Sequence, residues 1–132
     1  KAGFTDGTPW IGVNPNCKTI NARAELADED SVFHYYRHLI ALRKQYDVVS
    51  DGDFQPVTAE DDGVFAYART LPGETLLVVC NFYGEDYTWQ ADRTLDGFRV
   101  LLGNYPAAAP TGQSIALRPY EALVLYRKGA QA

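Results

Sequence analysis

Apolar side chains recur at helical spacing between Ser31 and Tyr46, and no other stretch of the chain shows this pattern. At about 100° per residue, one side of the predicted helix is apolar and the other side is polar. The apolar side covers roughly half the circumference, which is wider than the ~100° stripe of a typical surface helix. We therefore expect this helix to pack against two neighbours. The apolar positions are Val32, Phe33, Tyr35, Tyr36, Leu39, Ile40, Leu42 and Tyr46.

Charged residues mark the start of this helix and one position within its apolar side. Asp28, Glu29 and Asp30 precede the helix, where negative charge suits the helix dipole, and Asp30 or Ser31 can cap the free N–H groups. Arg43 lies in the middle of the apolar side. Its stem could pack while its head reaches water, or its head could be buried against a carboxylate of a neighbouring element. The sequence favours neither interpretation.

Residues 1–27 are rich in glycine, proline and asparagine, and we expect them to form a loop throughout. A loop of that length is uncommon unless it is functional or supported by other protein. Phe4, Trp10, Ile11 and Val13 are apolar groups that a lone loop could not bury. They predict a surface that another part of the protein covers.

After the helix, short runs of apolar residues alternate with turn residues. The run at 75–82 is almost continuously apolar, which indicates a strand buried on both faces, and we place it at the centre of the sheet. Pro56 cannot donate to a central ladder, so the first strand is expected at an edge. Regularly spaced short strands are typical of antiparallel sandwiches and open barrels. The expected strands are 54–57, 64–70, 75–82, 87–90, 98–102, 114–117 and 122–126.

These patterns predict a mostly β fold class. The predicted architecture is an antiparallel β-sandwich of Greek-key type over residues 49–128, preceded by the loop of residues 1–27 and by one α-helix within residues 28–48.

Composition and charge exclude some classes of partner. The 132 residues carry a formal net charge of −5, which disfavours nucleic acid and anionic membranes. No apolar run approaches the ~20 residues of a membrane span. The chain contains no methionine, so we expect it to be part of a longer protein. Cys17 and Cys80 are better explained as free thiols than as a disulfide, which favours a reducing, cytoplasmic location.

The chain lacks the side-chain groupings that catalysis or metal binding requires. Hydrolysis by paired carboxylates needs the two groups about 5–5.5 Å apart or somewhat more, whereas the acidic residues here lie mostly in turns and at the helix start. His34 and His38 have the spacing of a metal pair on the polar side of the helix, but no third ligand is evident. The carboxylates of residues 60–62 could attract a divalent ion and are more simply explained as a solvated turn. We predict no catalytic residue, no metal site and no cofactor.

Several motifs resemble one branch of the α-amylase superfamily, which contains oligo-1,6-glucosidases, α-glucosidases, dextran glucosidases and trehalose-6-phosphate hydrolases. The resemblance is dense from residue 2 to residue 46 and thinner in the strands. Cys17 is a departure, because relatives usually carry tyrosine after the VNPN motif. The motifs that carry the resemblance are AGFTDGTPW at 2–10, VNPN at 13–16, IN at 20–21, DSVFHYY at 30–36, LIALRK at 39–44 and LRPYEA at 117–122.

The resemblance implies a parent enzyme that hydrolyses α-glucosidic bonds of short oligosaccharides with retention. Its nucleophile, acid/base and third carboxylate would lie upstream, in a (β/α)₈ barrel. The helix within residues 28–48 would be the last barrel helix, and residues 49–128 would form the C-terminal β domain. The piece in hand would be inactive alone and structural, with the missing barrel as its partner. The candidate interface residues are Arg43, Trp10, Phe33, Tyr36 and Ile40.

Two other functions stay open at this point. A carbohydrate-binding module with a weak oligosaccharide contact requires at least two exposed aromatic rings that are coplanar and a sugar's length apart. A protein-interaction domain is the other, and the apolar loop around Trp10 is its only support.

Overall fold

The computed structural model describes residues 2–57 and 63–129. The chain divides into two compact units, residues 1–41 and residues 42–132. The boundary falls inside helix α2, Val32–Gln45. The second unit therefore contains the end of α2 together with the whole β domain.

The first unit contains two short helices that the sequence did not predict. They are the 3₁₀ helix η1, Pro15–Lys18, and α1, Ala22–Ala27, so the expectation of a loop throughout residues 1–27 is wrong for these segments. The side chain of Asn14 accepts a hydrogen bond from the backbone N–H of Asn16 over 3.2 Å, and that of Asn21 accepts one from Ala24 over 3.0 Å. Asparagines that looked like helix breakers act as N-caps instead.

Helix α2 forms where the apolar periodicity predicts it, within one residue at each end. The hydroxyl of Ser31 accepts a hydrogen bond from the backbone N–H of His34 over 3.4 Å, which confirms Ser31 as a capping residue. The same hydroxyl donates to the carbonyl oxygen of Glu25 over 2.6 Å, and the Glu25 carboxylate accepts from the N–H of Phe33 over 3.3 Å. These bonds connect α1 to the first turn of α2. In the described part of the chain, no helix has the length and apolar content to cross a bilayer.

A further short helix, α3, Asp47–Asp51, follows α2 directly and was also missed. It turns at Gly52, where an added Cβ would lie 2.5 Å from the carbonyl oxygen of Val48 and 3.1 Å from the Cβ of Arg69. A side chain at this position would clash with the carbonyl group of α3 itself and crowd Arg69 of the sheet, so only glycine fits. Gly52 thus lets α3 lie directly against the sheet that follows.

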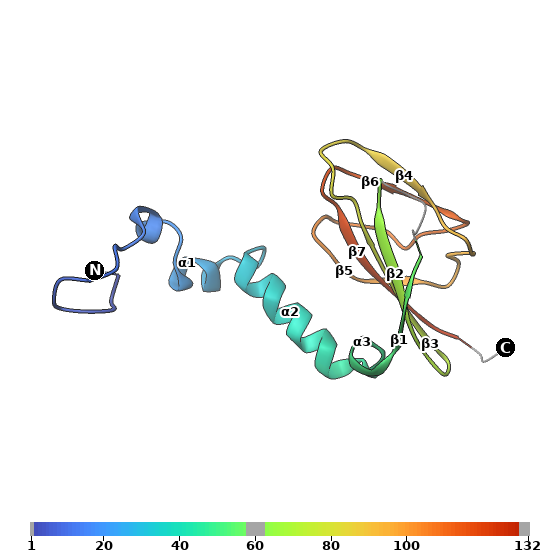
Figure 1. Ribbon diagram of the computed structural model, residues 1–132, viewed down its shortest axis with the longest axis horizontal. Coiled ribbons are helices and arrows are strands. Elements are labelled where there is room, and N and C mark those ends of the chain that lie inside the picture. The colour runs from blue at the N-terminus through green and yellow to red at the C-terminus, as the bar shows by residue number, and fades with distance from the viewer. Residues whose placement is uncertain (1, 58–62, 130–132) are drawn as a thin grey trace. The chain divides into compact units, whose positions relative to one another are not determined.

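The β domain is an antiparallel sandwich, which confirms the predicted fold class (Figure 1). Its five-stranded sheet has the order β1-β2-β3-β7-β5, and β4 pairs with β6 in a second, two-stranded sheet. From β3 to β7 each successive strand changes sheet, and β7 returns beside β3, a connection found in Greek keys. The strands are β1 Asp53–Pro56, β2 Phe65–Leu71, β3 Glu74–Cys80, β4 Tyr87–Gln90, β5 Arg99–Gly103, β6 Ser114–Leu117 and β7 Ala122–Lys128.

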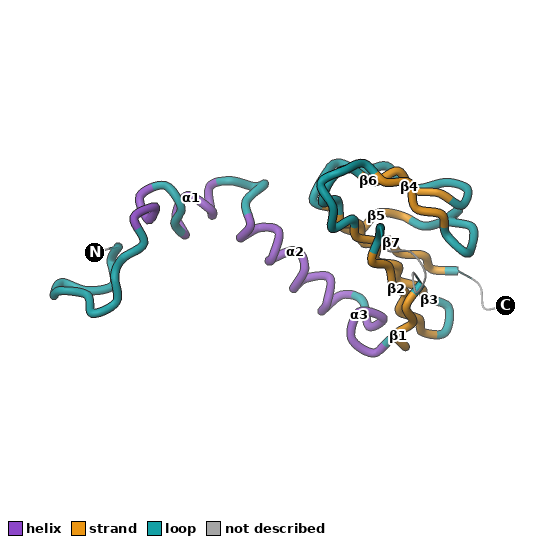
Figure 2. The backbone as a smooth tube through the Cα atoms, turned by 45° about the horizontal axis from the view of Figure 1, so that its top comes forward, coloured by secondary structure: helices purple, strands orange, loops and turns teal. Residues whose placement is uncertain are grey.

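The main core lies between the two sheets (Figure 2). Leu77 and Val79 of β3 point into this core, while Leu76 and Val78 point to the opposite, outer face of the five-stranded sheet. The central strand is therefore covered on both faces, as its continuous apolar run predicts. The buried core residues are Val64, Ala66, Ala68, Leu77, Val79, Trp89, Leu95, Phe98, Ile115, Leu117, Leu123 and Leu125.

Candidate functional site

The described residues contain no grouping of three or more His, Cys, Asp and Glu side chains that could hold a metal ion. His34 lies with its Nε2 3.3 Å from the carbonyl oxygen of Leu26, so the ring is used in joining α1 to α2. His38 is exposed one turn further along. The acidic turn at 60–62 lies outside the described residues. Exposed apolar surfaces are the other candidates among the described residues.

The first surface is the apolar side of α2. Phe33, Tyr36 and Ile40 are spaced three and four residues apart, so they lie on one side of the helix, and all three are exposed. Helix α2 buries none of its residues. At these three positions no described residue covers the apolar side predicted from the sequence, and its role as an interface stays a prediction.

The second surface is the loop before η1. Trp10 is 95% exposed, and Phe4, Ile11 and Val13 are also exposed. These four side chains line one open hollow of about 740 Å³ together with Cys17. The structure thus brings together the apolar loop residues that the sequence singled out, around a space that no described side chain fills.

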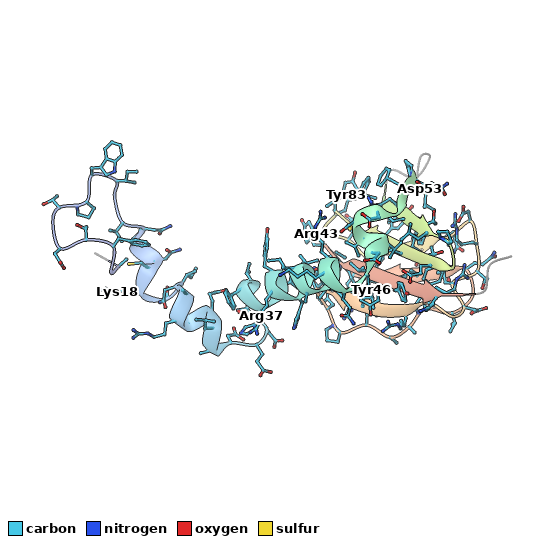
Figure 3. The ribbon with its side chains drawn as sticks, turned by 90° about the horizontal axis from the view of Figure 1, so that it is seen from below. Lys18, Arg37, Arg43, Tyr46, Asp53 and Tyr83 are labelled. Atoms are coloured by element: carbon cyan, nitrogen blue, oxygen red, sulfur yellow. The ribbon has the colours of Figure 1, made fainter. Side chains whose placement is uncertain are left out.

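Arg43 is exposed and, within the described residues, forms no hydrogen bond or ion pair (Figure 3). The helix-to-sheet anchor in this chain is Arg69 of β2. Its Nε donates to the carbonyl oxygen of Val48 over 3.1 Å, and its Nη2 donates to that of Ser50 over 3.0 Å. Arg69 therefore binds α3 to the outer face of the sheet. The alternation of Phe65, Tyr67 and Arg69 along the strand is the only sequence signal that places it on this face.

A second arginine holds the junction between α2 and the sheet. Arg99 of β5 donates from Nη2 to the hydroxyl of Tyr46 over 2.8 Å. Its guanidinium carbon lies 5.2 Å from the ring centre of Tyr126 and 5.8 Å from that of Tyr46, and the two rings are 4.8 Å apart. Burial raises the pKa of Tyr126, and nearby Glu74 adds to the effect. Tyr46 is thereby fixed against the β domain (Figure 3).

The outer face of the five-stranded sheet carries a second apolar cluster. Val48 of α3 is completely buried there against Leu76, Val78 and Tyr126. Tyr67 and Cys80 pack at the border of this cluster, and burial raises the pKa of both side chains. Beyond this border the face is open to solvent.

The open part of this face carries four connected aromatic side chains, which we call the aromatic strip: Phe54, Phe65, Tyr67 and Phe82. Phe54 and Tyr67 have ring centres 5.2 Å apart, Phe65 and Tyr67 5.7 Å apart, and Phe65 and Phe82 6.2 Å apart. Their planes are inclined to one another by 32–51°. These pairs do not form the coplanar platform that the carbohydrate-binding hypothesis requires.

The LRPYEA motif at 117–122 forms the turn between β6 and β7. The Glu121 carboxylate, on a residue only 2% exposed, accepts hydrogen bonds from Nε, Nη2 and the backbone N–H of Arg118 over 2.7–2.9 Å. The guanidinium of Arg118 also donates to the carbonyl oxygen of Pro106 over 2.7 Å and lies 4.3 Å from the ring centre of Tyr105. Hydrogen bonding from Arg118 holds the pKa of Glu121 below its usual value. This buried carboxylate is occupied by its own turn, so we assign it a structural role.

Comparisons with known families divide the chain at the end of α3. Residues 1–52 match the family described as Alpha amylase, catalytic domain. Residues 54–124 match the family described as Maltogenic Amylase, C-terminal domain. The second match covers β1 from its second residue, all of β2 to β6, and the beginning of β7.

Curated relatives and solved structures resemble the chain over nearly its whole length. It is 46% identical over 129 residues to an oligo-1,6-glucosidase of Halalkalibacterium halodurans, which covers 96% of this chain and 23% of that protein. It is 41% identical over 122 residues to the trehalose-6-phosphate hydrolase of Escherichia coli, covering 92% of this chain and 22% of that protein.

Two crystal structures show the same similarity. The trehalose-6-phosphate hydrolase of Bacillus licheniformis superposes with a TM-score of 0.84 at 39% identity, over 95% of this chain and 23% of that one. The isomaltulose synthase of Klebsiella sp. LX3 superposes with a TM-score of 0.85 at 37% identity, over the same shares. The chain thus spans about 23% of the length of these relatives.

Proposed function

Because this chain belongs to the α-amylase superfamily, with a maltogenic-amylase-type C-terminal domain at residues 54–124, we propose that it is the non-catalytic C-terminal part of a retaining α-glucosidase. Its role in that enzyme is structural: it closes and stabilises the catalytic barrel. The observation that carries the proposal is the 46% identity to an oligo-1,6-glucosidase over 96% of this chain.

The chemistry supports a division of labour between this chain and a larger catalytic part. Retention requires two carboxylates about 5–5.5 Å apart on either side of the scissile bond. The best-buried described carboxylate, Glu121, is already bonded to Arg118. We therefore propose that the reacting groups belong to the part of the catalytic domain that these 132 residues do not contain.

We propose the substrate class from the names of the relatives. Their names include oligo-1,6-glucosidase, trehalose-6-phosphate hydrolase and isomaltulose synthase. All three names point to short saccharides, so we propose short α-glucosides as the substrates. The cytoplasmic location expected from the sequence stays a prediction, which cell fractionation would test.

The proposal is tested by two assays with p-nitrophenyl α-glucoside. The 132-residue chain alone should show no turnover. A chimaera, in which this chain replaces the matching segment of the Halalkalibacterium halodurans enzyme, should hydrolyse the substrate with retention, as read by NMR of the released anomer. The unaltered relative is the control. Turnover by the chain alone would contradict the proposal. So would a chimaera that is inactive although its cooperative unfolding shows that it is folded.

A further inference from the structure

The aromatic strip exposes three phenylalanine rings to solvent. Phe54 is 53% exposed, Phe65 46% and Phe82 66%. Connected apolar surface of this kind marks an interaction site on a protein. None of the four side chains carries a charge at neutral pH, so the strip suits an apolar partner.

The strip continues an apolar face of the sheet, and other residues of this chain cover the rest of that face. On the same face, Leu76 and Val78 lie buried under Val48 of α3. Tyr67 belongs to both halves, because its ring contacts Phe54 and Phe65 while the residue also packs against the buried cluster. The aromatic strip is thus the uncovered half of one apolar face.

The covering half comes from residues that match the catalytic domain. Helix α3, Asp47–Asp51, lies within residues 1–52, which match that family. The chain spans only about 23% of its relatives, so most of a catalytic domain lies outside these 132 residues. The outside of a (β/α)₈ barrel is a ring of helices.

From this continuity we infer that the aromatic strip is the docking surface for an apolar helix face on the outside of the catalytic barrel. It extends the contact that α3 begins on the same sheet. The inference rests on the proposed function, because that function supplies the barrel as partner. Two other occupants, a second copy of this chain and a saccharide, are outcomes that the experiment separates.

Hydroxyl-radical footprinting reads the exposure of each aromatic side chain directly. We compare the 132-residue chain alone with the chimaera that carries it. In the chimaera, oxidation of Phe54, Phe65 and Phe82 should fall about fivefold, because the core of an interface excludes water from rings that are now about half exposed. Tyr120, which is 62% exposed and outside the strip, is the internal control and should change less than about twofold.

Three other results overturn the inference. Equal oxidation of the strip in both proteins means that no barrel helix covers it. Protection in the chain alone that grows with protein concentration assigns the strip to a second copy, and protection by millimolar isomaltose assigns it to a saccharide. A chimaera that is protected but inactive refutes the proposed function and leaves the docking surface standing. An active chimaera with an unprotected strip refutes the docking surface and leaves the proposed function standing.

A double variant tests whether the strip itself makes the contact. Phe65→Thr with Phe82→Thr in the chimaera should return the oxidation of Phe54 to the rate seen in the chain alone. Threonine keeps the strand preference of position 65 while removing the ring. The matched control is Tyr120→Asn, since asparagine accepts the φ of 57° at that position, and it should leave Phe54 protected. Continued protection of Phe54 in the double variant would overturn the inference.

Discussion

Arg69 donates a hydrogen bond from its Nε to the carbonyl oxygen of Val48 over 3.1 Å, and this bond joins strand β2 to helix α3. The helix has five residues, too few to be stable without packing. Its one buried residue, Val48, lies on the sheet, and a second bond from Arg69 holds the carbonyl group of Ser50. The position of α3 therefore depends on one side chain of the strand beneath it.

Replacing Arg69 by methionine should destabilise the chain by about 1.5–3 kcal/mol, because two charge-assisted hydrogen bonds to backbone carbonyls are lost. Methionine keeps an unbranched apolar stem, so packing on the sheet changes little. The free energy of unfolding is measured with urea, using tryptophan fluorescence for the core around Trp89 and far-ultraviolet circular dichroism for the helices.

Arg43→Met is the matched control for this change. Arg43 is an exposed arginine without a bonding partner among the described residues, so its replacement should alter stability by less than about 0.5 kcal/mol. Equal effects of the two substitutions would show that Arg69 does not anchor α3. A large effect of Arg43→Met alone would instead show that Arg43, and not Arg69, holds the helices to the sheet.

The Arg118–Glu121 pair should make stability depend on pH on the acid side. Hydrogen bonds from Arg118 lower the pKa of Glu121 from its ordinary value of 4.5, so the folded state binds this proton less tightly than the unfolded state. The stabilisation is fully present above pH 4.5 and is lost as the pH falls through the lowered pKa. Glu121→Gln should therefore cost about 2 kcal/mol at neutral pH and progressively less in acid.

Asp92→Asn provides the control for the pH experiment. Asp92 is an exposed carboxylate bonded to its sequence neighbour Arg93 over 2.6 Å, and the pKa of Asp92 is also lowered, chiefly by that bond. Exposed pairs contribute little to stability, so this variant should stay within about 0.5 kcal/mol of the parent. A Glu121→Gln variant whose deficit stays constant down to pH 3 would contradict the assignment to Glu121.

The strands could be predicted from the sequence because period-two alternation and turn residues act locally. β4 and β6 fall on the predicted residues, and the other strands differ at their ends. The central place of β3 follows from its continuous apolar run, which no edge strand would need. The short helices η1, α1 and α3 could not be predicted, because each is too short to show helical periodicity.

The exposed apolar surfaces were predicted only in part. Trp10, Phe33, Tyr36 and Ile40 could be recognised because large apolar side chains stand out in a polar loop or on a helix. The aromatic strip was missed because its members come from separate segments of the chain. Only the fold of the sheet brings Phe54 of β1 beside Tyr67, and Phe82, just beyond β3, beside Phe65. Arg69 was missed for the same reason, since its bonds reach back about twenty residues.

The hairpin between β2 and β3 should depend on Gly73. Its φ of +75° lies in the left-handed region, where a side chain costs about 1–2 kcal/mol. An added Cβ would meet only the carbonyl oxygen of Gly129, at an ordinary 3.5 Å, so Gly73→Ala should show this conformational cost alone. Gly129→Ala is the control, because its φ is not positive and the nearest side-chain atom would be 3.9 Å away. Equal stabilities of the two alanine variants, measured by thermal unfolding, would refute this account.

The apolar side of α2 should matter only when the catalytic barrel is present. Ile40 is exposed in this chain, and serine has nearly the same helix propensity, so Ile40→Ser should change the stability of the 132-residue chain by less than about 0.5 kcal/mol. In the chimaera the same change should cost about 2–4 kcal/mol and lower the melting temperature, because a buried isoleucine is truncated there. His38→Ser, on the polar side of the helix, should leave both proteins unchanged. An Ile40→Ser chimaera as stable as its parent would remove α2 from the interface, since a side chain that packs against the barrel cannot be truncated without loss.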